Sequence, residues 1–138
     1  MKIWSLLFVT AFTFFAVSCG ETEVPAAPEP ESLVDYKDGV YTEYYPGRKA
    51  IKFKGPKDEN GQRDGMWFYY AENGTEQSMT EYTHGKKNGS SFSRYPNGGM
   101  HYFGDWYDDK QVGVWVSYNP DGTIAEEKDY GPRPDTVE

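Results

Sequence analysis

Cysteine and histidine are scarce in this sequence. The 138 residues contain one cysteine, Cys19, so no intramolecular disulfide can form. The two histidines, His84 and His101, are not at matching places in the pattern described below, and we expect no zinc site. Catalytic motifs are also missing: we find no Gly-x-Ser-x-Gly turn, no phosphate-binding loop and no dinucleotide fingerprint. We therefore expect no enzymatic activity, no cofactor and no metal.

Positive charge is in short supply as well. Fourteen Lys and Arg residues stand against twenty-two Asp and Glu residues, which gives a net charge of −8. The basic residues form no stripe or patch, so nucleic acid is not an expected partner. The densest carboxylate cluster, residues 105–109, lacks the ligand spacing of an EF-hand and is expected to be a solvated turn.

Only one long apolar run is present, from Ile3 to Val17, after the short basic start Met1-Lys2. It is shorter than the roughly 20 residues that span a membrane, but it has the length of a signal-peptide core. The segment Ala16-Val17-Ser18-Cys19 resembles the lipobox of bacterial lipoproteins, with Ala16 where Leu is most common. The resemblance implies that residues 1–18 are a signal peptide. It also implies that lipidated Cys19 tethers the protein to the bacterial cell envelope, most simply the outer membrane. The alternative is an ordinary secretory peptide.

Residues 19–36 are rich in proline and glutamate and poor in apolar side chains. Such a composition predicts a disordered tether between the membrane and a folded domain. We place the domain at residues 37–131 and a C-terminal tail at 132–138, because the prolines of Gly131-Pro132-Arg133-Pro134 cannot continue a strand ladder.

An internal repeat organises the folded domain. Its glycines recur at intervals of 24 residues in two series, Gly65, Gly89, Gly113 and Gly74, Gly98, Gly122. Aromatic and β-branched runs alternate with Asn-Gly or Asp-Gly pairs, which are strong hairpin signals. We predict an all-β antiparallel meander of about four repeats.

The repeat favours one layer of sheet. In the run Gly65 to Tyr70, Trp67 and Tyr69 share one face, whereas Met66, Phe68 and Tyr70 share the other. A two-sheet sandwich leaves one face of a strand polar. Because both faces are aromatic here, we predict an elongated single-layer sheet in which large rings shield one another.

The repeat resembles the MORN repeat, in the variant common in exported bacterial proteins. The best matches to its pattern are Gly65/Trp67/Tyr70/Asn73-Gly74, Tyr82/Gly85-Lys86/Gly89 and Gly113/Trp115/Tyr118/Asp121-Gly122. The third unit departs from the pattern, with Ser91 for Trp, Arg94 for Tyr, and Asp109 for a turn glycine. The resemblance implies a scaffold or binding surface and not a catalyst. Some relatives are linked to phospholipids, and some carry an antitoxin label.

The candidate binding surface consists of Trp67, Tyr69, Trp115, Lys86 and Lys87. Trp67 and Trp115 hold the same repeat position two units apart, with small Ser91 between them. We expect two aromatic walls with a shallow gap that suits a peptide or a glycan. The alternative is that neighbouring Tyr and Lys side chains cover both indoles and that the gap is ordinary packing.

Three functions are compatible with these features. The leading one is a membrane-tethered binding or scaffold module with a protein or glycan partner. The second is an antitoxin-like partner that neutralises a toxin, and the third is an enzyme with an unfamiliar site.

The anchor can be tested directly. Replacing Cys19 with Ala should prevent lipid attachment, leaving the protein unprocessed by the lipoprotein peptidase or releasing it from membranes. Fractionation and the mass of the mature chain measure this. A Cys19→Ala protein that still has the mature lipoprotein's size and membrane association would contradict the lipobox interpretation.

Overall fold

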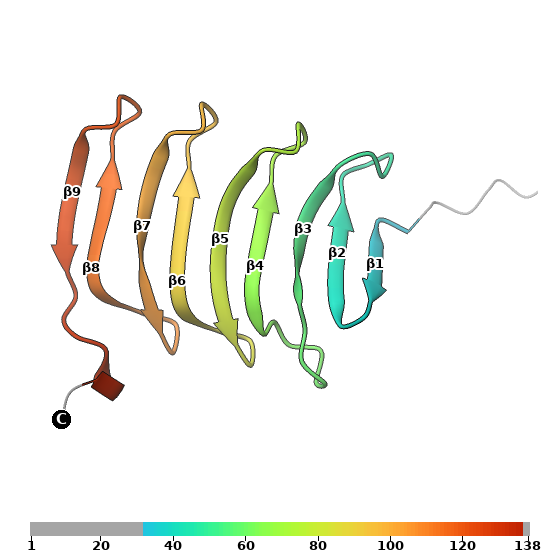
Figure 1. Ribbon diagram of the computed structural model, residues 1–138, viewed down its shortest axis with the longest axis horizontal. Helices are drawn as coiled ribbons and strands as arrows, with labels where there is room; N and C mark the ends of the chain where they lie inside the picture. The colour runs from blue at the N-terminus through green and yellow to red at the C-terminus, as the bar shows by residue number, and fades with distance from the viewer. Residues whose placement is uncertain (1–31, 137–138) are drawn as a thin grey trace, which may run out of the picture. The chain divides into compact units, whose positions relative to one another are not determined.

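The computed structural model describes residues 32–136, which form one open antiparallel sheet (Figure 1). Neighbouring strands in the sheet are consecutive in the sequence, with the first and the last strand at its two edges, so the sheet is a meander. Its strands are β1 (Val34–Lys37), β2 (Val40–Tyr44), β3 (Ile51–Pro56), β4 (Gly65–Tyr70), β5 (Glu76–Thr83), β6 (Lys86–Arg94), β7 (Met100–Tyr107), β8 (Lys110–Tyr118) and β9 (Ile124–Asp129). A 3₁₀ turn, η1 (Pro134–Thr136), follows β9.

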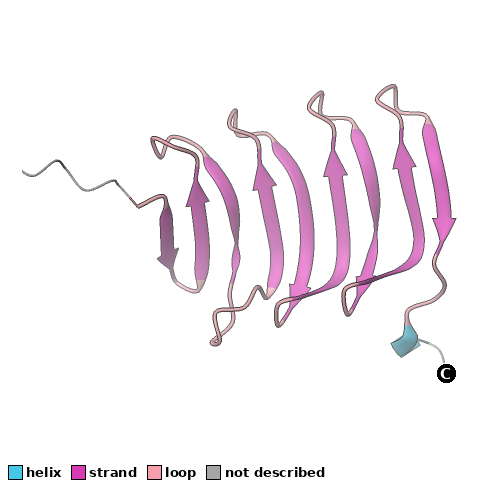
Figure 2. Cartoon of the chain, turned by 180° about the vertical axis from the view of Figure 1, so that it is seen from behind, coloured by secondary structure: helices cyan, strands magenta, loops and turns pink. Residues whose placement is uncertain are grey.

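No second layer covers the sheet within these residues, as the view from behind also shows (Figure 2). The prediction of an all-β, single-layer antiparallel meander is confirmed. The four units predicted from the sequence account for eight strands, whereas the sheet has nine.

The additional strand is β1, and it shows that the folded domain begins earlier than predicted. Val34 and Tyr36, which we assigned to the tether, are register partners of Glu43 and Tyr41 in β2. The proline and glutamate content of the preceding residues obscured the strand, although the alternation from Val34 to Lys37 and the Asp38-Gly39 pair after it are hairpin signals. The signal peptide, Cys19 and the tether up to residue 31 lie outside the described residues.

The turns at the two ends of the sheet differ in type. At one end, Gly74, Gly98 and Gly122 have φ of 84°, 85° and 86°, as the hairpin signals predicted. At the other end, two-residue turns have both residues at positive φ, as in a type I′ turn. One of these is Asp108-Asp109, where Asp109 lacks the freedom of glycine, but its carboxylate accepts a hydrogen bond from the Lys87 N–H at 2.8 Å.

The buried core consists of Trp67, Val112, Trp115 and Val116, and its two tryptophans lie across glycines of the neighbouring strand. A Cβ added to Gly55 would lie 2.4 Å from the Trp67 ring, and one added to Gly104 would lie 2.3 Å from the Trp115 ring. Trp67 and Trp115 have exposed fractions of only 5% and 9%. Each indole nitrogen donates to a backbone carbonyl, at 2.7 Å from Trp67 to Pro56 and at 3.0 Å from Trp115 to Asp105.

The two indoles share one face of the sheet, as predicted from strand alternation. The register leads from Trp67 through Thr80 and Ser91 to Gly104, on which Trp115 lies. We call this side the tryptophan face. The opposite face carries an apolar row in continuous register, made of Phe68, Met79, Phe92, Phe103 and Val116.

This packing predicts that the sheet does not tolerate a side chain at Gly104. Gly104→Ala should lower the free energy of unfolding by about 2 kcal/mol or more, because the methyl group overlaps a rigid ring wedged against the backbone. The matched control is Gly99→Ala, whose Cβ would meet only the Asn97 side chain at 3.2 Å. Urea unfolding of the two variants measures the difference. Equal midpoints would show that the Trp115–Gly104 contact does not hold the sheet together.

Candidate binding groove

The predicted surface residues fall into two groups. Trp67, Tyr69 and Lys86 are engaged in contacts within the sheet, whereas Trp115 and Lys87 line an open groove. The Tyr69 hydroxyl accepts a hydrogen bond from Tyr45 at 3.2 Å, and this bond is the main cause that raises the pKa of Tyr45 to about 12. The Lys86 ammonium group forms an ion pair with Asp108.

Trp67 is covered by side chains from both sides. The guanidinium of Arg63 lies over the indole, with Cζ 4.5 Å from the ring centroid, and it donates to the Tyr82 hydroxyl at 3.1 Å. The Tyr41 ring packs 5.5 Å from the indole. Only a hollow of about 60 Å³ remains beside it. Trp67 is therefore covered, as in the alternative to an open stacking wall, but by an arginine and a tyrosine and not by the Tyr and Lys side chains that the alternative named.

The shallow gap that we expected at Ser91 is absent. Ser91 has an exposed fraction of 4%, and its hydroxyl lies 2.9 Å from the Thr80 hydroxyl and donates to the Met79 carbonyl at 3.1 Å. The small side chain therefore fills its place in the tryptophan face and leaves no opening.

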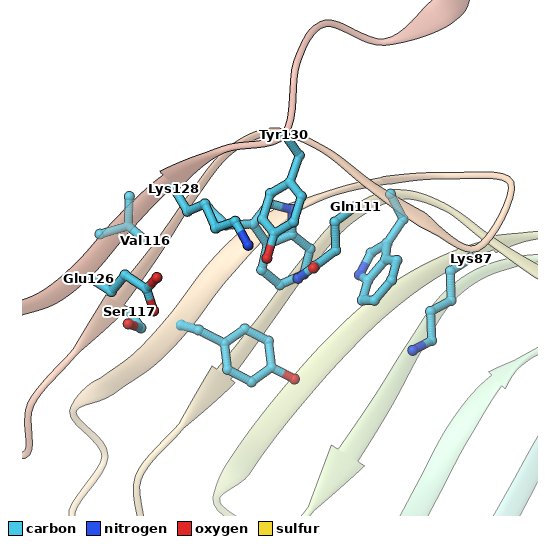
Figure 3. Close-up of a pocket in the computed structure, with 10 residues that line it drawn as sticks. Lys87, Gln111, Val116, Ser117, Glu126, Lys128 and Tyr130 are labelled. Carbon is cyan, nitrogen blue, oxygen red and sulfur yellow. The ribbon is translucent and has the colours of Figure 1, made fainter.

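An open groove of about 440 Å³ lies further along the same face, over β6 to β9. Figure 3 shows Lys87 at one side of it and Glu126, Lys128 and Tyr130 at the other, with Gln111 between them. The lining residues are Lys87, Tyr102, Trp106, Gln111, Trp115, Val116, Ser117, Glu126, Lys128 and Tyr130.

The groove is open because the residue that covers Trp67 has a shorter counterpart beside Trp115. Arg63 stands four positions before Trp67, and Gln111 stands four positions before Trp115, two repeats later. Arg63 reaches across the Trp67 indole to Tyr82, the tyrosine at the end of the hairpin. The residue that corresponds to Tyr82 two repeats later is Tyr130. A neutral glutamine is shorter and has no guanidinium plane to lay over the ring. With Gln in place of Arg at this repeat position, an open groove remains beside Trp115, although the indole itself is buried.

Aromatic rings form the floor and walls of the groove. Trp115 packs edge-on against Trp106, with centroids 5.0 Å apart, and the Tyr102 ring lies 5.8 Å from Trp115. Tyr130 has an exposed fraction of 39%. Aromatic walls with a few polar groups at the rim are typical of ligand sites.

Two lysines bring positive charge to these rings. The Lys87 ammonium lies 4.2 Å from the Trp106 centroid, and the Lys128 ammonium lies 4.6 Å from the Tyr130 centroid. Among the described residues neither forms a salt bridge, and Glu126 is the only carboxylate among the lining residues.

One indole in the groove lacks a hydrogen-bond acceptor. Trp106 Nε1 is buried and has no partner in the described part of the chain, unlike the corresponding nitrogens of Trp67 and Trp115. A buried donor without an acceptor costs roughly 1–3 kcal/mol. An acceptor brought by a ligand would offset that cost.

Other polar clusters are structural. Asp58 accepts hydrogen bonds from the backbone of Asn60 and Gln62 and lies 3.0 Å from His84 Nδ1. This contact is the main cause that raises the pKa of His84 and lowers that of Asp58. It holds the loop that carries Arg63 against the β5–β6 turn.

Residues 32–136 contain no group of three or more His, Cys, Asp or Glu side chains arranged to hold a metal ion. Over the same residues, no helix has the length and apolar character needed to cross a membrane. Comparison of the chain with protein-family models, with curated proteins and with solved structures gave no match.

Sequence reasoning missed most of the groove. The predicted surface did not include Tyr102, Trp106, Gln111, Lys128 or Tyr130. The signal that points to them is the exchange of Arg63 for Gln111 at one repeat position, next to the same tryptophan.

Proposed function

We propose that the protein is a binding module of the bacterial cell envelope, tethered through lipidated Cys19, with the groove over β6 to β9 as its ligand site. The observation that carries the proposal is the open groove of about 440 Å³ beside Trp115, at a position where the second repeat is closed by Arg63. The 24-residue pattern and its resemblance to MORN repeats support the same view, since such arrays serve as scaffolds and binding surfaces.

The Pro- and Glu-rich tether fits this role. If the segment from Cys19 to the first strand is extended, as its composition predicts, it would span ~3.1 Å per residue and would hold the sheet away from the membrane surface. The groove is then accessible to ligands in the surrounding space.

The binding site can be located with the indole N–H signals of the ¹⁵N-labelled full chain. A panel of defined oligosaccharides and synthetic peptides is titrated, and we expect a ligand to shift the signals of Trp106 and Trp115. Trp67 is an internal control, because Arg63 covers it and no comparable opening lies beside it.

The matched variant is Gln111→Arg, which introduces at Trp115 the residue that closes the site at Trp67. It should fold normally and lose ligand binding. Gln62→Arg adds the same charge on an exposed loop and should bind as the unmodified chain does. Binding that survives Gln111→Arg, or that shifts Trp67 as strongly as Trp115, would contradict the groove as the site.

A further inference from the structure

The groove concentrates positive charge in an otherwise acidic chain. The net charge is −8, yet two ammonium groups and one carboxylate line the groove. Elsewhere in the described sheet, Lys52 and Lys86 are neutralised by Glu43 and Asp108. Lys87 and Lys128 instead lie over aromatic rings, so their charges remain available to an anion.

The rings determine what kind of anion fits. The Lys87 and Lys128 ammonium groups lie over the faces of Trp106 and Tyr130, so a ligand ring stacks on these faces only when the flexible lysine side chains move aside toward its charge. The negative faces of the π-systems then attract the slightly positive C–H bonds of a flat aliphatic ring. A carboxylate on such a ring places its charge near Lys87 or Lys128 while the ring stacks on the aromatic wall.

The unpaired Trp106 N–H requires an oxygen acceptor. Its nitrogen is buried, so an oxygen reaches it only when a neighbouring side chain moves. Gln111 is the register partner of Trp106, and its flexible side chain is close enough to be the one that moves. A hydroxyl-rich ligand supplies the acceptor, and its other hydroxyls can bond the Gln111 amide and the Glu126 carboxylate.

The backbone disfavours an extended peptide over the groove. The strands β7 and β8 under it are paired on both sides, whereas β9 at its rim is an edge strand that pairs only with β8. A peptide added to β9 as a further strand would lie beside the sheet and not over its face. The groove itself offers side chains alone, which suits a sugar.

We propose that the groove binds a hexuronate unit of an acidic polysaccharide. The sugar ring stacks on the aromatic wall, its carboxylate faces one of the two lysines, the carboxylate of an adjoining unit faces the other, and a ring or hydroxyl oxygen accepts from Trp106. This inference rests on the proposed function, because it names the ligand class of the same groove.

The test compares charged and uncharged forms of one sugar. Tetrasaccharides that contain galacturonate, mannuronate or glucuronate are titrated into the full chain by calorimetry, each beside its methyl ester, with tetraglutamate as an acidic peptide. We expect at least one oligouronate to bind and its ester to bind about tenfold more weakly or worse, because the ester removes the charge that the lysines contact; tenfold corresponds to about 1.4 kcal/mol.

The variants assign the contacts. Lys87→Met and Lys128→Met keep the apolar stem and should each weaken oligouronate binding about tenfold, whereas Lys110→Met, at an exposed position outside the groove, should have little effect. Trp106→Phe keeps a six-membered aromatic ring and removes the N–H together with the rest of the pyrrole ring, so it should weaken binding without loss of the fold. Thermal melting confirms that each variant is folded.

The outcomes separate this inference from the proposed function. Equal binding of acid and ester overturns the hexuronate inference but leaves the groove as a site if Trp106 and Trp115 signals shift. Equal or tighter binding of tetraglutamate overturns it in favour of an acidic peptide. If no oligouronate shifts either signal, the hexuronate inference is wrong. If Gln111→Arg has no effect on any ligand found, the proposed function is wrong as well.

Discussion

A single layer of sheet must bury its side chains without a second layer to cover them. Here the solution is a tryptophan laid flat across a glycine of the next strand. Trp67 lies on Gly55 and Trp115 on Gly104, closely enough that a methyl group would overlap the ring. Each indole also donates to a backbone carbonyl, so its one polar atom is satisfied inside the packing. Aromatic rings and the aliphatic stems of basic residues then pack around each tryptophan on the same face of the sheet.

The same constraint explains the groove. Because no other layer exists, whether a tryptophan is covered depends on one or two side chains of the adjoining turn and strand. Arg63 closes the space at Trp67, held by the Tyr82 hydroxyl and by a loop that Asp58 and His84 fasten to the sheet. Gln111 does not close the corresponding space at Trp115. A periodic scaffold therefore becomes a binding site through a change at one repeat position, with the strand ladder unaltered.

The strands and turns were predictable because they depend on local chemistry: Asn-Gly and Asp-Gly pairs set the hairpins, and aromatic alternation sets the faces. The first strand, β1, was missed because residues 34–36 directly follow a proline- and glutamate-rich stretch and were assigned to the tether. Their pairing with β2 shows that they belong to the sheet. The site was predictable only in part. Trp115 and Lys87 line the groove, but Trp67, which occupies the same repeat position and is buried like Trp115, has only a small hollow beside it. The space beside Trp67 is filled by Arg63 in a loop outside the repeat's strands, which spacing alone does not show.

The central claim is that the residue four positions before each tryptophan decides whether the site is open. The most direct measurement is the structure of an Arg63→Gln variant, which gives the second repeat the residue found beside Trp115. The account predicts an unchanged sheet with Trp67 uncovered and a new groove next to Tyr82, similar to the one next to Tyr130. A variant structure in which Trp67 remains covered by other side chains, with no new groove, would contradict it.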